Sequence, residues 1–249
     1  MMKKIIYICL SVLLFACDSE NANDCFQKSG RIITEELNLP AFTKIKVNRD
    51  VELILKEGLT QKVIIETGEN LLNDVKLSVV NERLEITEDN RCNFVRDYNI
   101  TKVYVTSPNI TEIISSTQFK ISSDGILNYP DLDVLSEDFN DASIIAVGEV
   151  DLQLNSETLK VVANNLTTFK FEGTTENLDI TFAAGDGKCN AANLIADNVS
   201  IYHRGTNKII VNPQLELTGT LVSTGNLISK NHPPLVDVEA LYTGRLIFE

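Results

Sequence analysis

Residues 148–173 read GEVDLQLNSETLKVVANNLTTFKFEG and contain the pattern that decides the fold. Apolar residues occupy every second position from Val150 to Leu154, which is the period of a strand with one buried face. A turn-forming pair, Asn164-Asn165, separates this strand from a second alternation at Phe169 and Phe171. Two short strands joined by a corner therefore form the local unit.

The unit repeats along the second half of the chain. Its turn-forming residues are Gly125, Gly148, Asn165, Gly187, Gly205, Gly225 and Gly244, with steps of 23, 17, 22, 18, 20 and 19 residues. A repeat of this length, built from short strands and a corner, is typical of a solenoid. The fixed Leu and Asn spacing of a leucine-rich repeat is absent. We therefore expect a right-handed parallel β-helix over residues 111–249, and a β-sandwich with evenly spaced turns is the alternative.

The first half of the chain is also rich in strands. Short, β-branched, alternating runs lie at residues 51–56, 62–66, 76–80 and 83–87. Asn81-Glu82 is predicted to be a hairpin turn, and residues 69–74 a brief helical turn. Helical patterns long enough for βαβ units are absent, so the chain is predicted to be all-β, with residues 30–110 as a β-rich N-terminal cap.

The N-terminus has the pattern of a bacterial lipoprotein signal. Lys3 and Lys4 precede an apolar run over residues 5–15, which is shorter than the roughly 20 residues that a membrane-spanning helix needs. The sequence Leu-Phe-Ala-Cys ending at Cys17 resembles a lipobox. The resemblance implies that residues 1–16 are a signal peptide and that Cys17 carries the lipid. Residues 17–29 are then a tether, and the protein is held at the outer membrane, on its periplasmic face or at the cell surface.

The charge of the chain limits its partners. The whole chain has a formal charge of −13, from 22 Lys and Arg against 35 Asp and Glu. Loss of residues 1–16 removes two lysines and leaves 20 − 35 = −15. Such a surface repels nucleic acid, so the membrane, reached through the lipid, is the partner that the sequence predicts, with a glycan or a protein as ligand.

Three cysteines remain beyond the signal and the lipidated residue: Cys25, Cys92 and Cys189. A lipoprotein folds outside the cytoplasm, where disulfides persist, and three thiols allow one bridge and one remaining thiol. Cys25 and Cys92 both lie in polar, loop-like surroundings, so we expect them to pair. Cys189 is then a small buried apolar residue.

The order of several segments resembles the putative auto-transporter adhesin, head GIN domain family. The matching segments are a Phe before residues 44–47, then residues 50–53, 70–72, 84–86 and 90–96. The resemblance covers the chain from about Gly30 to the end as one domain. It implies a single-stranded right-handed β-helix, in agreement with the repeat, and an adhesive function.

Candidate catalytic groups are few. His203 is expected on an outward strand face and His232 in a loop before two prolines, and neither has neighbours at metal-ligand spacing. The sequence offers no nucleophile elbow and no phosphate-binding loop. One acidic cluster could hold calcium as in a polysaccharide lyase, with Lys120 or Arg204 as the base; its members are Asp131, Asp133, Glu137, Asp138 and Asp141. A solvated charged face is the simpler interpretation.

A second candidate surface combines two cations and two aromatic residues in an acidic chain. Arg91, Phe94, Arg96 and Tyr98 could stack on a sugar or an anionic group, or the arginines could pair with carboxylates at a strand edge. The sequence thus predicts a non-catalytic adhesion, binding or scaffold module without cofactor, metal or catalytic residue. A calcium-dependent, carbohydrate-active enzyme is the alternative.

Overall fold

A computed structural model describes residues 24–90, 92–139, 142–145 and 147–249. Within these residues the chain is all-β, as predicted, and its helical pieces are two 3-10 turns, Asp24–Phe26 and Leu72–Asp74. The second turn lies inside the predicted helical turn. No helix in this part of the chain is long and apolar enough to cross a membrane. The predicted signal peptide and Cys17 lie outside the described residues.

All strands belong to one curled sheet. In chain order they are β1 (Ile32–Leu37), β2 (Lys44–Arg49), β3 (Glu52–Glu57), β4 (Lys62–Gly68), β5 (Val75–Val80), β6 (Arg83–Glu88), β7 (Lys102–Ser107), β8 (Glu112–Thr117), β9 (Lys120–Leu127), β10 (Asp131–Ser136), β11 (Glu149–Ala163), β12 (Thr168–Phe182), β13 (Lys188–His203), β14 (Ile209–Leu221), β15 (Leu227–Ser229), β16 (Leu235–Ala240) and β17 (Leu246–Phe248).

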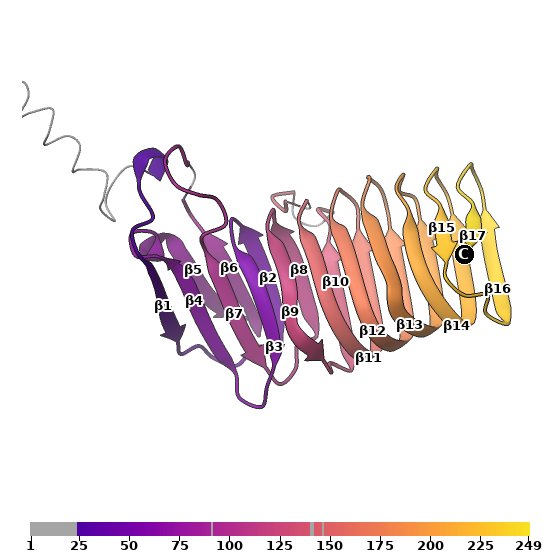
Figure 1. The fold of residues 1–249 in the computed structure, drawn as a ribbon, viewed down its shortest axis with the longest axis horizontal. Coiled ribbons are helices and arrows are strands. Elements are labelled where there is room, and N and C mark those ends of the chain that lie inside the picture. The colour runs from indigo at the N-terminus through magenta and orange to yellow at the C-terminus, as the bar shows by residue number, and fades with distance from the viewer. Residues whose placement is uncertain (1–23, 91, 140–141, 146) are drawn as a thin grey trace, which may run out of the picture.

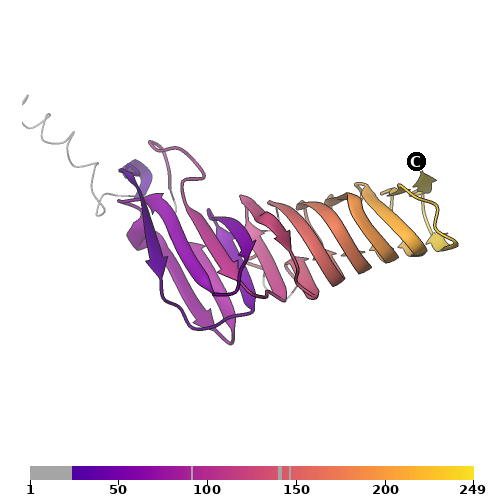
Figure 2. The same cartoon turned by 60° about the horizontal axis from the view of Figure 1, so that its bottom comes forward.

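Parallel pairing arranges these strands in two rows. Row A contains β6, β2, β8, β10, the second parts of β11 to β14, and β16. Row B contains β7, β3, β9, the first parts of β11 to β14, β15 and β17. We call a row B segment and the row A segment that follows it a rung. Glu149 pairs with Thr168, and Thr168 with Lys188, so successive rungs are offset by 19 and 20 residues. The strands from β11 to β14 lie side by side along the long axis of the molecule (Figures 1 and 2).

The N-terminal end departs from chain order. β2 lies between β6 and β8, and β3 lies between β7 and β9, so an early segment is inserted between later ones (Figure 1). Antiparallel strands complete this end: β5 pairs with β6, while β4 pairs with β7 and with β1. The predicted hairpin at Asn81-Glu82 is confirmed, and both residues have positive φ, as a tight two-residue turn requires.

The core lies between the two rows. The alternating apolar residues point inward, and the largest of them in the middle rungs, Phe169, Phe171 and Phe182, are fully or almost fully buried. Phe169 stands 6.1 Å from Phe171 and 5.8 Å from Phe182, measured between ring centroids. Truncating one such ring to alanine costs about 3–5 kcal/mol. The aromatic stack therefore contributes strongly to the stability of the middle of the sheet.

The repeated glycines from Gly148 onward lie at the edge where row A turns into row B, whereas Gly125 lies inside β9. Neighbouring turns hydrogen bond through their backbones, with Gly225 N donating to Gly205 O at 3.2 Å. A Cβ at Gly148 would lie 2.4 Å from the carbonyl oxygen of Thr117, and a Cβ at Gly244 would lie 2.4 Å from that of Gly225. Close approach of adjacent turns therefore explains glycine at these corners.

Candidate binding pocket

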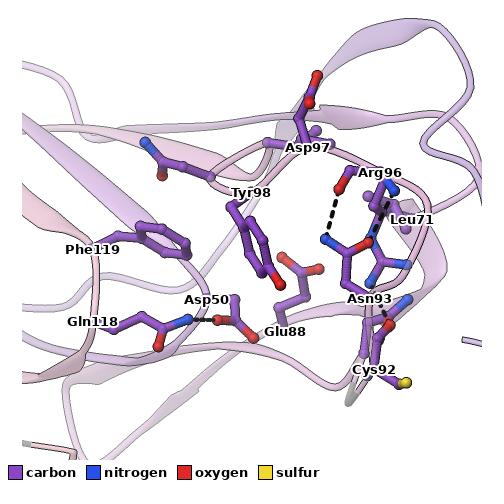
Figure 3. A pocket seen from close by; sticks show the side chains of 13 residues that line it. Asp50, Leu71, Glu88, Cys92, Asn93, Arg96, Asp97, Tyr98, Gln118 and Phe119 are labelled. Carbon is purple, nitrogen blue, oxygen red and sulfur yellow. Dashed lines mark hydrogen bonds between the residues drawn. The ribbon is translucent and has the colours of Figure 1, made fainter. Parts of the chain in front are cut away.

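A pocket opens at the same edge, near the N-terminal end of the sheet. Because β6, β2 and β8 are parallel neighbours, their C-terminal ends lie together. The end of β6 contributes Glu88 to the pocket, the end of β2 contributes Asp50, and the end of β8 contributes Gln118. The connection from β6 to β7, residues 89–101, is much longer than the turns that follow β11 to β14, and it forms most of the remaining wall. The cavity has a volume of about 250 Å³ (Figure 3).

Two carboxyl groups of the pocket, Glu88 and Asp50, have raised pKa values. Glu88 is 5% exposed, and burial raises its pKa to about 7. The nearby charges of Asp50 and Asp74 raise this pKa further, whereas a hydrogen bond from Thr101 and the charge of Arg96 lower it. Burial also raises the pKa of Asp50, whose carboxylate accepts a hydrogen bond from Gln118 (Figure 3). At neutral pH Glu88 is therefore present in both protonated and ionised forms.

The long connection is held in place by a disulfide and by one arginine. Cys25 and Cys92 are bonded, as the sequence predicts, with their Cα atoms 4.4 Å apart. The guanidinium of Arg96 donates to three backbone oxygens, those of Asp24 at 2.8 Å, Gln27 at 3.2 Å and Cys92 at 3.1 Å. These bonds join residues 92–96 of the pocket wall to the N-terminal segment.

The surface proposed from the sequence is only partly assembled. Arg96 and Tyr98 line the pocket, but Phe94 does not; it packs against Phe26, with 5.8 Å between ring centroids. Arg91 lies outside the described residues. Tyr98 is 72% exposed and its side chain stands among the pocket residues in Figure 3. Arg96 bonds backbone carbonyls, which is neither of the roles that the sequence suggested for it.

Sequence reasoning missed the pocket residues of the strand ends: Asp50, Glu88, Gln118 and Phe119. They come from three segments that are distant in the chain, and their meeting depends on the insertion of β2 between β6 and β8. The available signal was Glu88, a charged residue that continues the inward alternation of Leu84 and Ile86. A carboxyl on the buried face of a strand points to a site.

For the lyase alternative, Lys120 does not serve the acidic cluster as a base. Asp131 and Asp133 lie on β10, Glu137 and Asp138 follow it, and Asp141 lies outside the described residues. Lys120 instead contacts Asp151 at 2.6 Å and Glu149 at 3.2 Å, and the hydrogen bond to Asp151 raises its pKa. A proton-abstracting lysine needs a lowered pKa. In the described part of the chain, no three His, Cys, Asp or Glu side chains are grouped as metal ligands.

The expectation of an outward His203 is wrong. Its side chain is fully buried, with Nδ1 accepting from Gly205 N at 3.3 Å and Nε2 placed 2.8 Å from the oxygen of Asn207. Burial lowers its pKa, so the ring is neutral and donates through Nε2. Val199 and Ile201 precede it on the inward face, and the period of two already places His203 inward. His232 is in a loop, as predicted, and stacks on Phe248 with 4.3 Å between ring centroids.

Comparison with known proteins supports this fold. A putative adhesin from Bacteroides fragilis superposes with a TM-score of 0.79 at 21% identity, covering 89% of this chain and 99% of that one. A putative lipid binding protein from Parabacteroides distasonis gives a TM-score of 0.60 at 14% identity, covering 88% and 97%. A putative adhesin from Parabacteroides merdae gives 0.55 at 18% identity, covering 88% and 98%. No curated protein sequence matches the chain.

The family comparison agrees with the resemblance seen in the sequence. The model of the family described as putative auto-transporter adhesin, head GIN domain, matches residues 41–233. That span includes the pocket and all the strands from β2 to β15. The chain belongs to the head GIN domain family of putative auto-transporter adhesins.

Proposed function

We propose that this chain is a lipoprotein of the cell envelope and a non-catalytic binding module. Lipid on Cys17 holds it at the outer membrane, and residues 17–29 connect the lipid to the folded part. From residue 111 to residue 249 the two rows of strands continue as a single-stranded right-handed parallel β-helix, with residues 30–110 as its cap. The family, whose description is that of an adhesin, supports binding of a ligand at the cell envelope or surface.

One observation carries the binding assignment: a disulfide and hydrogen bonds attach the wall of the pocket to the N-terminal segment. The disulfide and the Arg96 hydrogen bonds hold the connection from β6 to β7 against the N-terminal segment. A ligand therefore does not bear the entropy cost of ordering this loop. Pre-organisation of this kind suits recognition.

The lining of the pocket indicates a glycan unit as the ligand. Tyr98 and Phe119 offer aromatic faces, while Asn99 and Gln118 carry amide groups that can bond hydroxyl groups. The amide of Asn93 is instead engaged by the backbone of Val95 and Arg96. The cavity, at about 250 Å³, is smaller than the usual range of roughly 300–1,000 Å³ for drug-sized ligands. It suits one sugar ring at a time rather than an enclosed oligosaccharide.

Binding without turnover is the function that the family description supports best. Burial raises the pKa of both Glu88 and Asp50, and the carboxylate of Asp50 accepts a hydrogen bond from Gln118. These two carboxyl groups are therefore the ones whose substitution tests for catalysis in this pocket.

Glycan-array binding compared between two aromatic variants tests the proposal. Tyr98→Ala removes a ring from the pocket, whereas Phe94→Ala removes an equally exposed ring four residues away that does not line it. We expect loss of binding in the first and retention in the second. Equal binding by both variants would refute this pocket as the site.

A parallel assay for reducing ends and unsaturated products, with and without calcium, tests for an enzyme. We expect no turnover. Turnover that disappears in Asp50→Asn and Glu88→Gln, or in variants of Asp131, Asp133 or Asp138, would replace the binding function by the carbohydrate-active enzyme.

A further inference from the structure

The outer face of row B carries a pair of lysines in direct register. Cys189 pairs with Ile209, so the residues that precede them, Lys188 and Lys208, lie side by side on neighbouring rungs, and both are exposed. Like charges directly opposite one another on parallel neighbours destabilise a sheet. In a chain with 35 acidic residues, this pair therefore calls for an explanation beyond folding.

Elsewhere on this face the lysines are neutralised. Lys120 contacts Glu149 and Asp151, and Lys170 contacts Glu172 at 2.9 Å and Asp151 at 3.5 Å. By contrast, in the described part of the chain neither Lys188 nor Lys208 has a carboxylate within 4.0 Å.

A carboxylate does lie in the wider surroundings of Lys208, but it is already bonded elsewhere. Glu249 accepts a hydrogen bond from Lys230 at 2.7 Å, and this bond is the main reason for its lowered pKa, with only a minor contribution from Lys208. The positive charge of the lysine pair is thus available to a ligand.

The lysine pair borders a hollow in the surface. The hollow has a volume of about 260 Å³, and its lining includes Glu149, Thr168, Lys170, Lys188, Asn190 and Lys208. The carboxylate of Glu149 is already paired with Lys120 at 3.2 Å. Thr168 pairs with Lys188, and Lys170 pairs with Asn190, so a hydroxyl and an amide residue alternate with the cations across two rungs. Neutral hydrogen-bonding groups beside cations suit a ligand that carries hydroxyl groups as well as an anion.

We propose that this hollow is a binding site for an acidic saccharide, with the carboxylate or sulfate of one sugar unit placed between Lys188 and Lys208. The charge of the rest of the chain repels extended polyanions, so the ligand is a short acidic oligosaccharide or a single acidic unit of a mostly neutral glycan. No residue lines both this hollow and the pocket near Cys92, although the two are neighbours along the sheet: Phe119 of the pocket precedes Lys120, which pairs with Glu149 of the hollow.

Titration calorimetry of the full chain with a uronate oligosaccharide, a sulfated oligosaccharide and a neutral one of equal length tests the site. The wild type should bind the two acidic ligands, more weakly as salt rises, and not the neutral one. Lys188→Gln with Lys208→Gln should lose about tenfold or more in affinity, the size expected for loss of charge-assisted hydrogen bonds. Lys188→Arg with Lys208→Arg keeps both positive charges, so this double variant should retain binding.

The matched control removes two lysines elsewhere. Lys160 lies on row A between Asp133 and Asp179, and Lys62 pairs with Glu36 at 2.8 Å. Lys62→Gln with Lys160→Gln changes the net charge equally and should leave binding unchanged. Equal loss in both double variants, or no binding by the wild type, would overturn the site. Inorganic sulfate, an oligonucleotide or anionic-lipid vesicles binding as tightly as the acidic oligosaccharide would overturn its assignment to a saccharide. Failure of this site leaves the Tyr98 experiment unaffected.

Discussion

His203 and Gly225 are in such close contact that no side chain fits between them. A Cβ at Gly225 would lie 2.1 Å from Nε2 of His203 and 2.3 Å from the carbonyl oxygen of Asn207, which is the partner of the same nitrogen. The φ angle of Gly225 is not in the left-handed region, so the need for glycine here comes from space alone. A buried histidine of one rung therefore determines a glycine of the next.

Gly225→Ala should destabilise the protein by about 1–3 kcal/mol, the usual cost of overpacking. Because a backbone oxygen also blocks the position, His203→Ala should relieve only part of this cost in the double variant. Chemical denaturation of the two single variants and the double variant measures the coupling. A Gly225→Ala protein as stable as the wild type would show that the two rungs separate without cost.

Stability should decrease as pH rises between 4.5 and about 7, because of Glu88. Its pKa is about 7 in the folded protein against an ordinary value of 4.5, so across this range the folded state keeps a proton that the unfolded state has lost. The difference corresponds to at most about 3 kcal/mol, since 2.5 pH units at 1.36 kcal/mol each is the full effect. Asp50 and Asp74, whose pKa values are also raised by burial, act in the same direction at lower pH.

Denaturation of Glu88→Gln across this range should show a flatter dependence on pH than the wild type. Glu157→Gln, at an exposed carboxylate, is the control and should leave the dependence unchanged. A Glu88→Gln protein with the full wild-type dependence would mean that another group titrates.

Loss of the Cys25–Cys92 bond should lower the free energy of unfolding by about 4 kcal/mol, on the chain-entropy estimate for a loop of this length. The two cysteines are 67 residues apart, and the bond closes the loop that contains Asp50 and Glu88. Denaturation of Cys25→Ala with Cys92→Ala, compared with the wild type, measures this. Cys189→Ala removes a buried free thiol and serves as the control, with a smaller expected loss. Peptide mapping without reductant that finds both thiols free in envelope-derived protein would contradict the bond.

Cys17→Ala should abolish lipidation, because the thiol is the atom that receives the diacylglycerol in the proposed lipoprotein. Labelling of growing cells with a palmitate analogue measures this, with Cys9→Ala as a control that keeps the anchoring cysteine. The Cys17→Ala chain should either keep its signal peptide uncleaved or be released from the membrane, since two or three acyl chains are what hold such a protein stably. Continued incorporation of label into this variant would rule the anchor out.

The sequence by itself determined the local geometry of this protein. Alternation from Val150 to Leu154, the corner at Asn165 and the steps near twenty residues predict strands, turns and their spacing, because each depends on a few neighbouring residues. The same period placed His203 inward, and the contrary expectation came from treating a histidine as a surface residue. The pairing of Cys25 with Cys92 was also within reach, since only three cysteines remained to be assigned.

Only the tertiary structure decided where the pocket is. Nothing near Asp50 in the chain indicates that β2 enters between β6 and β8, because strand pairing over long separations depends on the competition among all the edges available. That pairing brings Asp50, Glu88 and Gln118 together. It also removes the carboxyl groups of Asp50 and Glu88 from water far enough to raise their pKa values. Likewise, Lys188 and Lys208 become neighbours only through the register between β13 and β14, and a slip of one residue would turn one of them inward.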